Sequence, residues 1–476
     1  MTAPKHLVPR PPPRHRRAGL ILLGGGALTV LAAVALPDQD LSRAVVAALA
    51  AATLGLVAVL DRTLGVFATT GYLAVLGLGR RLVSVVLPDP ADDPLLLVAP
   101  LVVAGLALLV WRDGALRPPR GLTMTVAAAF VLTVAAIANP IAGPTANAKG
   151  ALFWSVPMLW FVVGRALPER ADMARLLRLV AVLGVGASAT GILQATVGFP
   201  PWDDRWIENR GYEALGINSP DTIRPFGWSS SAGEFALTAA FVVLLCAILS
   251  WTALRAGRWL GAAGWGAGLA VGAAALGLSG VRTAVLLAGL ALVVVAVASA
   301  GSRLREVLLG LAIVVVLLVG GVRALDVESW DGDGVSGMAR RSLIGLTDPF
   351  GEESTLQGHV DLTEVAFRTL DDRPLGGGPA YGTTASVRRG GVLRSAENDL
   401  GNAALAFGIP GVVMVVGVTA IGLGVAWRHA RAHPTFVALG CLALLVASLR
   451  FWWNGGQYAT AALTWLCLGW TDRPER

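Results

Sequence analysis

AGLILLGGGALTVLAAVAL, residues 18–36, is an unbroken apolar run that directly follows a basic, proline-rich segment at residues 1–17. A helix needs about 20 apolar residues to cross the hydrocarbon layer of a bilayer, so this run is long enough to span it. It is long for the apolar region of a signal peptide and lacks a convincing small-residue cleavage site. We therefore interpret residues 18–36 as a first transmembrane helix and residues 1–17 as a basic cytoplasmic tail.

The composition of the whole chain supports the same class. Of 476 residues, 55% are hydrophobic and 14% are charged, whereas soluble domains carry roughly a quarter of charged residues. The net charge of +7 comes mainly from arginines beside apolar blocks, which indicates membrane topology and no nucleic-acid partner. Cys246, Cys441 and Cys467 all fall inside apolar segments, so neither a disulfide framework nor a CxxC metal site is expected.

Apolar blocks recur along the chain and predict an all-α, polytopic bundle of about 12 to 14 transmembrane helices. The candidate spans lie near residues 18–36, 44–60, 64–87, 95–111, 122–138, 151–165, 179–197, 235–251, 259–278, 283–300, 306–322, 403–427, 435–449 and 459–470. Arginine-rich short loops alternate with short acidic loops, so the positive-inside rule places the arginines in the cytoplasm and agrees with the parity of this count. Membrane lipids are therefore expected to surround the chain.

Two connections, residues 198–234 and 323–402, are much longer than the others, and both are expected outside the cytoplasm. Connections longer than about 12 to 15 residues are uncommon unless they bind or catalyse. We predict, in order, a tail (1–17), N-terminal helices (18–197), a first long extracytoplasmic loop (198–234), central helices (235–322), a large extracytoplasmic catalytic loop with short helices (323–402), and C-terminal helices with a short cytoplasmic tail (403–476).

Four arginines at the expected outer membrane edge are candidate phosphate-binding residues. Arg282 opens a span after Ser279-Gly-Val, Arg224 precedes another span, and Arg80-Arg81 interrupt an otherwise apolar stretch. Ionisable groups at the membrane edge are functional candidates, and the planar arginine fork fits phosphate oxygens. Plainer interpretations stay open: Arg282 as a lipid-headgroup anchor, Arg224 as a solvated loop residue, and Arg80-Arg81 as solvated residues on an interfacial or broken helix.

The large loop contains the candidate acid–base residues. Ser354 and Gln357 fit a helix capping box, and the predicted helix runs to about Asp371, where Pro374 and three glycines end it. His359 is the one histidine of the expected extracytoplasmic loops, and its ordinary pKa suits proton transfer near neutrality. A structural role for His359 remains open, and Arg368 at i,i+4 from Glu364 is most simply a surface pair.

Several motifs of other enzyme classes are absent. The chain has no Walker loop, no HExxH, no GxSxG and no acidic pair of the DxD type in an early outer loop. We therefore expect no metal and no cofactor.

Four blocks of the chain resemble the O-antigen ligase and polysaccharide polymerase family. They are Arg224-Pro-Phe-Gly-Trp, Ser279-Gly-Val-Arg282, Ser354-Thr-Leu-Gln-Gly-His359 with Pro374-Leu-Gly-Gly-Gly, and Glu397-Asn398 followed by Gly408-Ile-Pro-Gly. Together they cover roughly the last 250 residues. Many members carry His-Asn where this chain has Glu397-Asn398, and an arginine where it has His359.

The resemblance implies a GT-C-like glycosyltransferase in the bacterial cytoplasmic membrane, with its active face outside. Its partners would be a polyprenyl-diphosphate-linked glycan donor and a glycan, lipid or wall acceptor. Arg282, Arg224 and Arg80-Arg81 would bind the diphosphate, His359 or Glu397 would take the acceptor proton, and Asn398 and Arg368 would contact substrate.

Two alternatives come from other classes. A flippase for lipid-linked glycans, or another transporter, would need charged residues along a path near the middle of the membrane. The apolar segments contain almost no acidic residues, and the unusual charge lies at the outer edge. A noncatalytic scaffold for envelope assembly is the second alternative. The sequence does not distinguish a ligase from a polymerase.

Overall fold

The structure is a computed structural model that describes residues 13–35, 39–87, 93–113, 120–166, 169–214, 223–300, 340, 356–381, 396, 398–453 and 458–473. Helices are the only regular elements in these ranges, so the all-α prediction is confirmed. The predicted span at 306–322, Ser354 and Glu397 lie outside the described residues.

The helices follow one another with short connections in most of the chain. Their bounds are α1 (Pro13–Ala35), α2 (Gln39–Leu60), α3 (Arg62–Val86), α4 (Val98–Arg112), α5 (Gly121–Ala135), α6 (Pro144–Ala166), α7 (Arg170–Thr196), α8 (Pro201–Ala214), α9 (Ala232–Arg255), α10 (Trp259–Leu278), α11 (Arg282–Ser299), α14 (Leu356–Asp372), α16 (Asp399–Ala432), α17 (Phe436–Ala447) and α18 (Tyr458–Thr471), with 3₁₀ turns η1 (Pro94–Leu97) and η2 (Ala136–Ala138).

Eight helical segments in the described ranges are long and apolar enough to cross a membrane. They are Ser42–Leu60, Pro94–Arg112, Gly121–Ala138, Arg170–Thr196, Ala232–Arg255, Trp259–Leu278, Arg282–Ser299 and Asp399–Ala432. The chain is therefore a multi-pass membrane protein. Other predicted spans form helices with different properties: α3 contains two buried arginines, and α18 has only 14 residues. The total number of spans stays a prediction.

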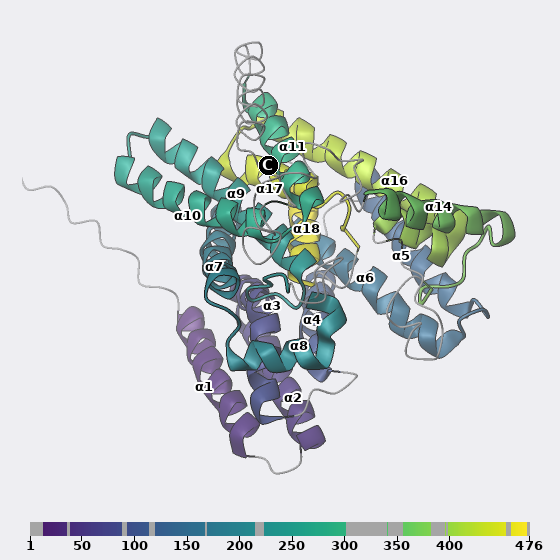
Figure 1. Cartoon of the computed structure of the whole chain (residues 1–476), viewed down its shortest axis with the longest axis horizontal. Helices are drawn as coiled ribbons and strands as arrows, with labels where there is room; N and C mark the ends of the chain where they lie inside the picture. The colour runs from purple at the N-terminus through teal and green to yellow at the C-terminus, as the bar shows by residue number, and fades with distance from the viewer. Residues whose placement is uncertain are drawn as a thin grey trace, which may run out of the picture.

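The centre of the bundle is formed by α9, α17 and α18 (Figure 1). In α17 every residue from Val437 to Ala447 is buried, and in α18 every residue from Thr460 to Thr471 is buried. Gly164 of α6 and Gly469 of α18 lack side chains at the point where each backbone contacts the other helix. Small residues at such crossings let membrane helices approach closely and gain dispersion contacts.

Helix α16 is broken at Gly408, whose φ of 64° is outside the helical region, and Pro410 follows the break. The glycine-rich turn after α14 fills this break. The N–H groups of Gly377 and Gly378 donate to the carbonyls of Leu405 and Ala406, each at 2.9 Å, and Ile409 N–H donates to Pro374 O at 2.9 Å. The backbone groups that the break releases are therefore satisfied, as a bilayer requires of an interrupted helix.

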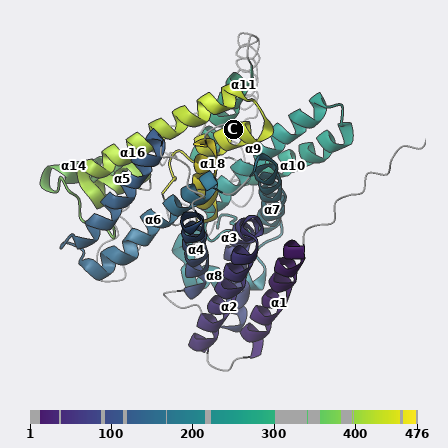
Figure 2. The ribbon, with the colours of Figure 1, turned by 180° about the vertical axis from the view of Figure 1, so that it is seen from behind.

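The turn is also bonded to α6 and to the residues just before it. Asn139 donates to the carbonyl of Gly376 at 3.2 Å, and Asn147 accepts the N–H of Ala380 at 3.2 Å. Figure 2 shows α14, α16, α5 and α6 gathered on one side of the molecule. The expected helix ending near Asp371 is present as α14, and the turn fixes it to the transmembrane helices.

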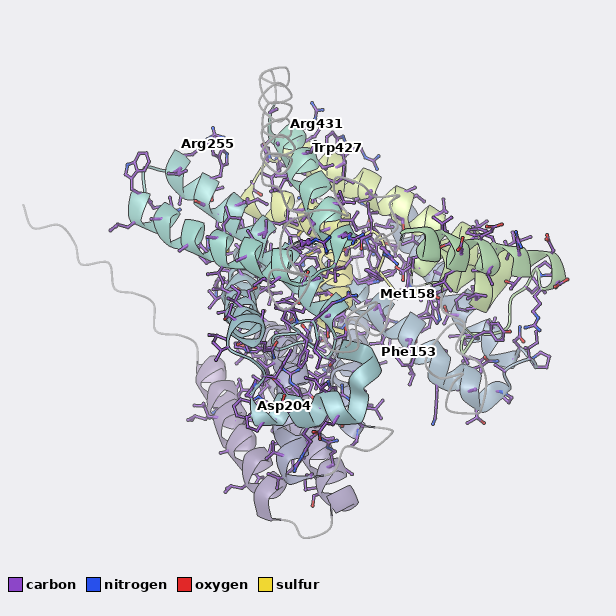
Figure 3. All side chains as sticks on the ribbon, in the orientation of Figure 1. Phe153, Met158, Asp204, Arg255, Trp427 and Arg431 are labelled. Atoms are coloured by element: carbon purple, nitrogen blue, oxygen red, sulfur yellow. The ribbon has the colours of Figure 1, made fainter. Side chains whose placement is uncertain are left out.

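The ends of the molecule differ in the loops that they carry. Arg255, the last residue of α9, and Arg431, near the end of α16, lie toward the upper end in Figure 3, whereas Asp204 on α8 lies toward the lower end. Helix α8 lies crosswise to α2 and α3 (Figure 1). The first long loop thus begins with a helix at the end of the bundle opposite to these arginines.

Candidate functional site

Residues 223–231, here called the PFGW segment, precede α9 and contain Arg224. Side chains of other helices bind the backbone of the PFGW segment. Arg81 donates to the carbonyls of Ser229 and Gly227, each at 2.5 Å, and Gln194 accepts the N–H groups of Phe226 at 3.0 Å and Gly227 at 2.7 Å. Gly227 has a φ of +52°, which favours glycine at this turn. The PFGW segment is therefore fixed in place without any regular element of its own.

Arg80 and Arg81 are buried inside the bundle, with 4% and 0% of their side chains exposed. Arg80 Nε lies 2.6 Å from Asp93 Oδ2, and Arg81 Nε lies 2.6 Å from Asp203 Oδ1. Arg80 also donates to Ser230 at 3.3 Å. The helix α3 that carries them is continuous, so the solvated and broken-helix interpretations are wrong. Both arginines therefore contact the PFGW segment, and each also pairs with an aspartate outside that segment.

Asp203 links this network to α8. It accepts a hydrogen bond from Gln194 at 2.7 Å, and the same Gln194 binds the PFGW segment. Burial raises the pKa of the Asp203 carboxyl, while the neighbouring Arg81 guanidinium lowers it. The pairing of Asp203 with Arg81 could not be seen in the sequence, because the two residues are far apart in the chain.

Arg224 lies against the turn that precedes α11. A Cβ atom placed on Gly280 would be 3.7 Å from Arg224 Cδ. Gly280 itself has a φ of +67°, and Ser279 holds the turn by donating to Leu276 O at 2.7 Å and accepting from Val281 N–H at 3.3 Å. Arg282, the first residue of α11, is half-buried. The structure thus places Arg224 beside the turn that carries Arg282.

Arg450, which the sequence analysis did not single out, lies beside the same turn. Its Nη1 is 3.3 Å from Thr283 Oγ1, and Thr283 follows Arg282 directly. The backbone carbonyl of Arg450 accepts the N–H of Asp399, the first residue of α16, at 3.0 Å. The only signal for it in the sequence was an arginine just beyond the predicted span 435–449, at the same expected membrane edge as Arg282.

Asn398 connects the start of α16 to α14. Its side-chain oxygen accepts the N–H of Gly401 at 2.8 Å and caps α16, and its Nδ2 donates to Thr363 Oγ1 at 2.9 Å. Thr363 lies one helical turn after His359 on α14, so both belong to the same helix face. The side chain of His359 and the whole of Glu397 lie outside the described residues. The helix that carries His359 is therefore bonded to the residue that follows Glu397.

Arg368 is at the surface of α14. Its side chain is 74% exposed and forms an ion pair with Glu364 at 2.5 Å. Such exposed i,i+4 pairs contribute only a few tenths of a kcal/mol to helix stability. Within the residues that the structure describes, no group of three or more His, Cys, Asp or Glu side chains is placed to hold a metal ion.

Part of this site comes from the turn between α10 and α11, from α14 and from the start of α16. Residues 267–416 match the O-antigen ligase family model. This confirms the resemblance over the O-antigen ligase domain, which contains Arg282, α14 and Asn398. Arg224, Arg80, Arg81 and Arg450 lie outside the matched residues. No curated protein gives a significant match. The domain supports a membrane role in joining or polymerising glycans.

Proposed function

We propose that this protein is a membrane glycosyltransferase that takes glycan from a polyprenyl-diphosphate donor at the outer face of a bacterial cytoplasmic membrane. The acceptor is a growing glycan, a lipid or a wall polymer. The observation that carries the proposal is the approach of Arg224 to the turn of Arg282, beside the start of α16. Arg282 and the start of α16 lie within the O-antigen ligase domain, and Arg224 lies outside it.

The two arginines suit the leaving group of this reaction. When the bond between the anomeric carbon and the phosphate oxygen breaks, negative charge develops on the diphosphate. Guanidinium groups bind phosphate oxygens through paired, charge-assisted hydrogen bonds. Groups positioned where charge develops stabilise the transition state without further reorganisation. We assign Arg224 and Arg282 to this role, which requires no metal ion.

The acceptor hydroxyl attacks the anomeric carbon from the opposite side, so the configuration at that carbon inverts. Its oxygen forms the new glycosidic bond, the polyprenyl diphosphate leaves, and the hydroxyl proton passes to a base. We assign His359 or Glu397 to that step. Asn398 supports the assignment, because it connects the helix of His359 to the capped start of α16.

Arg80 and Arg81 act on the same site through the PFGW segment. Their contacts with Ser230, Ser229 and Gly227 fix the segment that carries Arg224. We therefore assign them to positioning of the diphosphate site. Arg368, an exposed residue of α14, is assigned to the acceptor.

The test uses the purified chain in lipid nanodiscs with a polyprenyl-diphosphate-linked glycan, in the presence of a chelator. We expect glycan joined to acceptor and an equal amount of released polyprenyl diphosphate. Arg282→Ala should lower the rate about 10- to 100-fold, because a charge-assisted hydrogen bond contributes about 1.5 to 3 kcal/mol. Arg282→Lys should recover little, because lysine lacks the bidentate fork.

The matched control is Arg431→Ala, which removes an exposed arginine at the other end of α16. It should transfer glycan at the wild-type rate. Movement of the intact donor across the bilayer without transfer would favour the transporter and refute the proposal. In cells, loss of the chain separates the two activities: single lipid-linked repeats accumulate for a polymerase, and long undelivered chains accumulate for a ligase.

A further inference from the structure

We propose that Arg450 is a third phosphate-binding arginine of this site. The inference rests on the proposed function, because it assigns Arg450 to the diphosphate of the same donor. Its side chain contacts Thr283, the residue after Arg282, at 3.3 Å. Arg450 lies far from Arg224 and Arg282 in the sequence, on the segment that leaves α17.

Three separate elements meet at the turn before α11. The PFGW segment brings Arg224 to Gly280, the turn itself supplies Arg282, and the segment after α17 brings Arg450 to Thr283. Gly280 and Thr283 are three residues apart, so Arg224 and Arg450 approach the same turn of backbone that carries Arg282. A diphosphate carries negative charge on each phosphate and offers several oxygens, so more than one arginine at such a turn can bind it.

The backbone that carries Arg450 is firmly fixed. Trp452 and Trp453 are fully buried, with 1% and 2% of their surfaces exposed. Trp452 donates from Nε1 to Leu445 O at 3.0 Å, and its carbonyl accepts from Trp465 Nε1 at 2.6 Å. Arg450 lies in the chain between α17 and these two tryptophans and is only half-buried. The anchored segment therefore fixes the backbone of Arg450, and a preorganised site loses less conformational entropy on binding.

The same segment encloses the start of α16. Arg450 O accepts the N–H of Asp399, and Asp399 Oδ2 accepts the N–H of Trp453 at 2.9 Å. Asp399 directly follows Asn398, which is bonded to α14. Arg450 thus lies where the diphosphate arginines adjoin the residues that we assign to proton transfer.

A purely structural role would make a different prediction. In that case the contact of Arg450 with Thr283 only ties α17 to α11, and Thr283→Ala should have the same effect as Arg450→Ala. If Arg450 binds phosphate, Thr283→Ala keeps the charge and should change donor affinity far less than Arg450→Ala.

The experiment measures binding of undecaprenyl diphosphate to the full chain in nanodiscs of zwitterionic lipid, with undecaprenyl monophosphate as the second probe. Arg450→Ala should weaken diphosphate binding about 10- to 100-fold, the effect of losing a charge-assisted contact. Thr283→Ala and the control Arg431→Ala should stay within about threefold of wild type. The monophosphate should lose less affinity in Arg450→Ala, because it offers fewer oxygens to the arginines.

The outcomes separate the two proposals. Absence of diphosphate binding by the wild-type chain would overturn the proposed function. Normal wild-type binding that weakens in Arg282→Ala but not in Arg450→Ala would overturn this inference alone. Equal losses in Thr283→Ala and Arg450→Ala would also overturn it in favour of a structural tie. If Arg450→Ala does not fold, Arg450→Lys decides: it keeps the charge, and unchanged diphosphate affinity and transfer rate in this variant would count against phosphate binding by the arginine fork.

Discussion

Arg81→Ala should unfold at a markedly lower temperature than the wild type. The side chain is fully buried, with Nε 2.6 Å from Asp203 Oδ1 and its two Nη atoms 2.5 Å from carbonyls of the PFGW segment. The substitution leaves the buried Asp203 carboxylate without its cation and the two carbonyls without their donor. Breaking one partner of a buried ion pair costs about 3 to 5 kcal/mol. We expect a loss of free energy of unfolding of that size.

A second variant tests whether the loss comes from the ion pair. Removing both partners, in Arg81→Met with Asp203→Asn, leaves no uncompensated charge. The double variant should therefore be more stable than the sum of the two single variants predicts, by about 1 to 3 kcal/mol. Arg368→Ala is the control, because its exposed pair with Glu364 should contribute less than about 0.5 kcal/mol.

The local effect can be read by hydrogen exchange in the PFGW segment. Arg81→Ala should speed exchange there while the amides of α17 stay protected, because α17 does not contact Arg81 through any of these bonds. Thermal unfolding in detergent gives the global loss. An Arg81→Ala protein that unfolds within about one degree of wild type, with unchanged exchange in the PFGW segment, would refute the network that we describe.

Three further predictions follow from other residues. His359→Ala, folded to wild-type thermal stability, should bind the polyprenyl-diphosphate donor normally but transfer glycan about 100-fold more slowly; normal turnover would make the histidine structural. Gly408→Ala should lower the thermal unfolding midpoint, because a φ of 64° strains an L residue by about 1 to 2 kcal/mol and the new Cβ would collide with Pro374 O. Gly417→Ala in the same helix should leave the midpoint unchanged, because the nearest atom to its new Cβ would be 3.8 Å away. Burial raises the pKa of Asp203 and Arg81 lowers it, so Arg81→Ala leaves the pKa of Asp203 in the folded state further above its ordinary value of 3.8. The folded variant then binds more protons than the unfolded chain between these two pKa values, and its stability falls as the pH rises through that window. Equal pH profiles of thermal unfolding for the variant and the wild type would contradict this.

The sequence predicted most of the helices because length and apolarity are local properties. Each helix that crosses the membrane needs about 20 apolar residues, whatever its neighbours are. It also placed Arg224 and Arg282 at one membrane edge, because the alternation of arginine-rich loops reports the side of the membrane. Arg224 can then approach Gly280, two residues before Arg282, because both segments end at the same membrane edge.

The sequence could not predict which charges pair inside the bundle. Arg80 and Arg81 are adjacent, yet one pairs with Asp93 in the following loop and the other with Asp203 on α8. That choice depends on how α8 lies across α3, which no periodicity reports. Arg450 was missed for the same reason: its importance comes from Thr283, on a helix far away in the chain.

The broken α16 bears on how the chain is made at the ribosome. Synthesis proceeds from the N-terminus, so Pro374, Gly377 and Gly378 leave the ribosome before Leu405, Ala406 and Ile409, the residues that they bond. The groups that fill the interruption, and Asn139 and Asn147 that bond them, are therefore synthesised before α16 enters the bilayer. A bilayer does not satisfy open backbone groups, so this order makes partners available to α16 when it inserts. A circular permutant that begins at α16 would lose this order while keeping every final contact, and its membrane insertion should be less efficient.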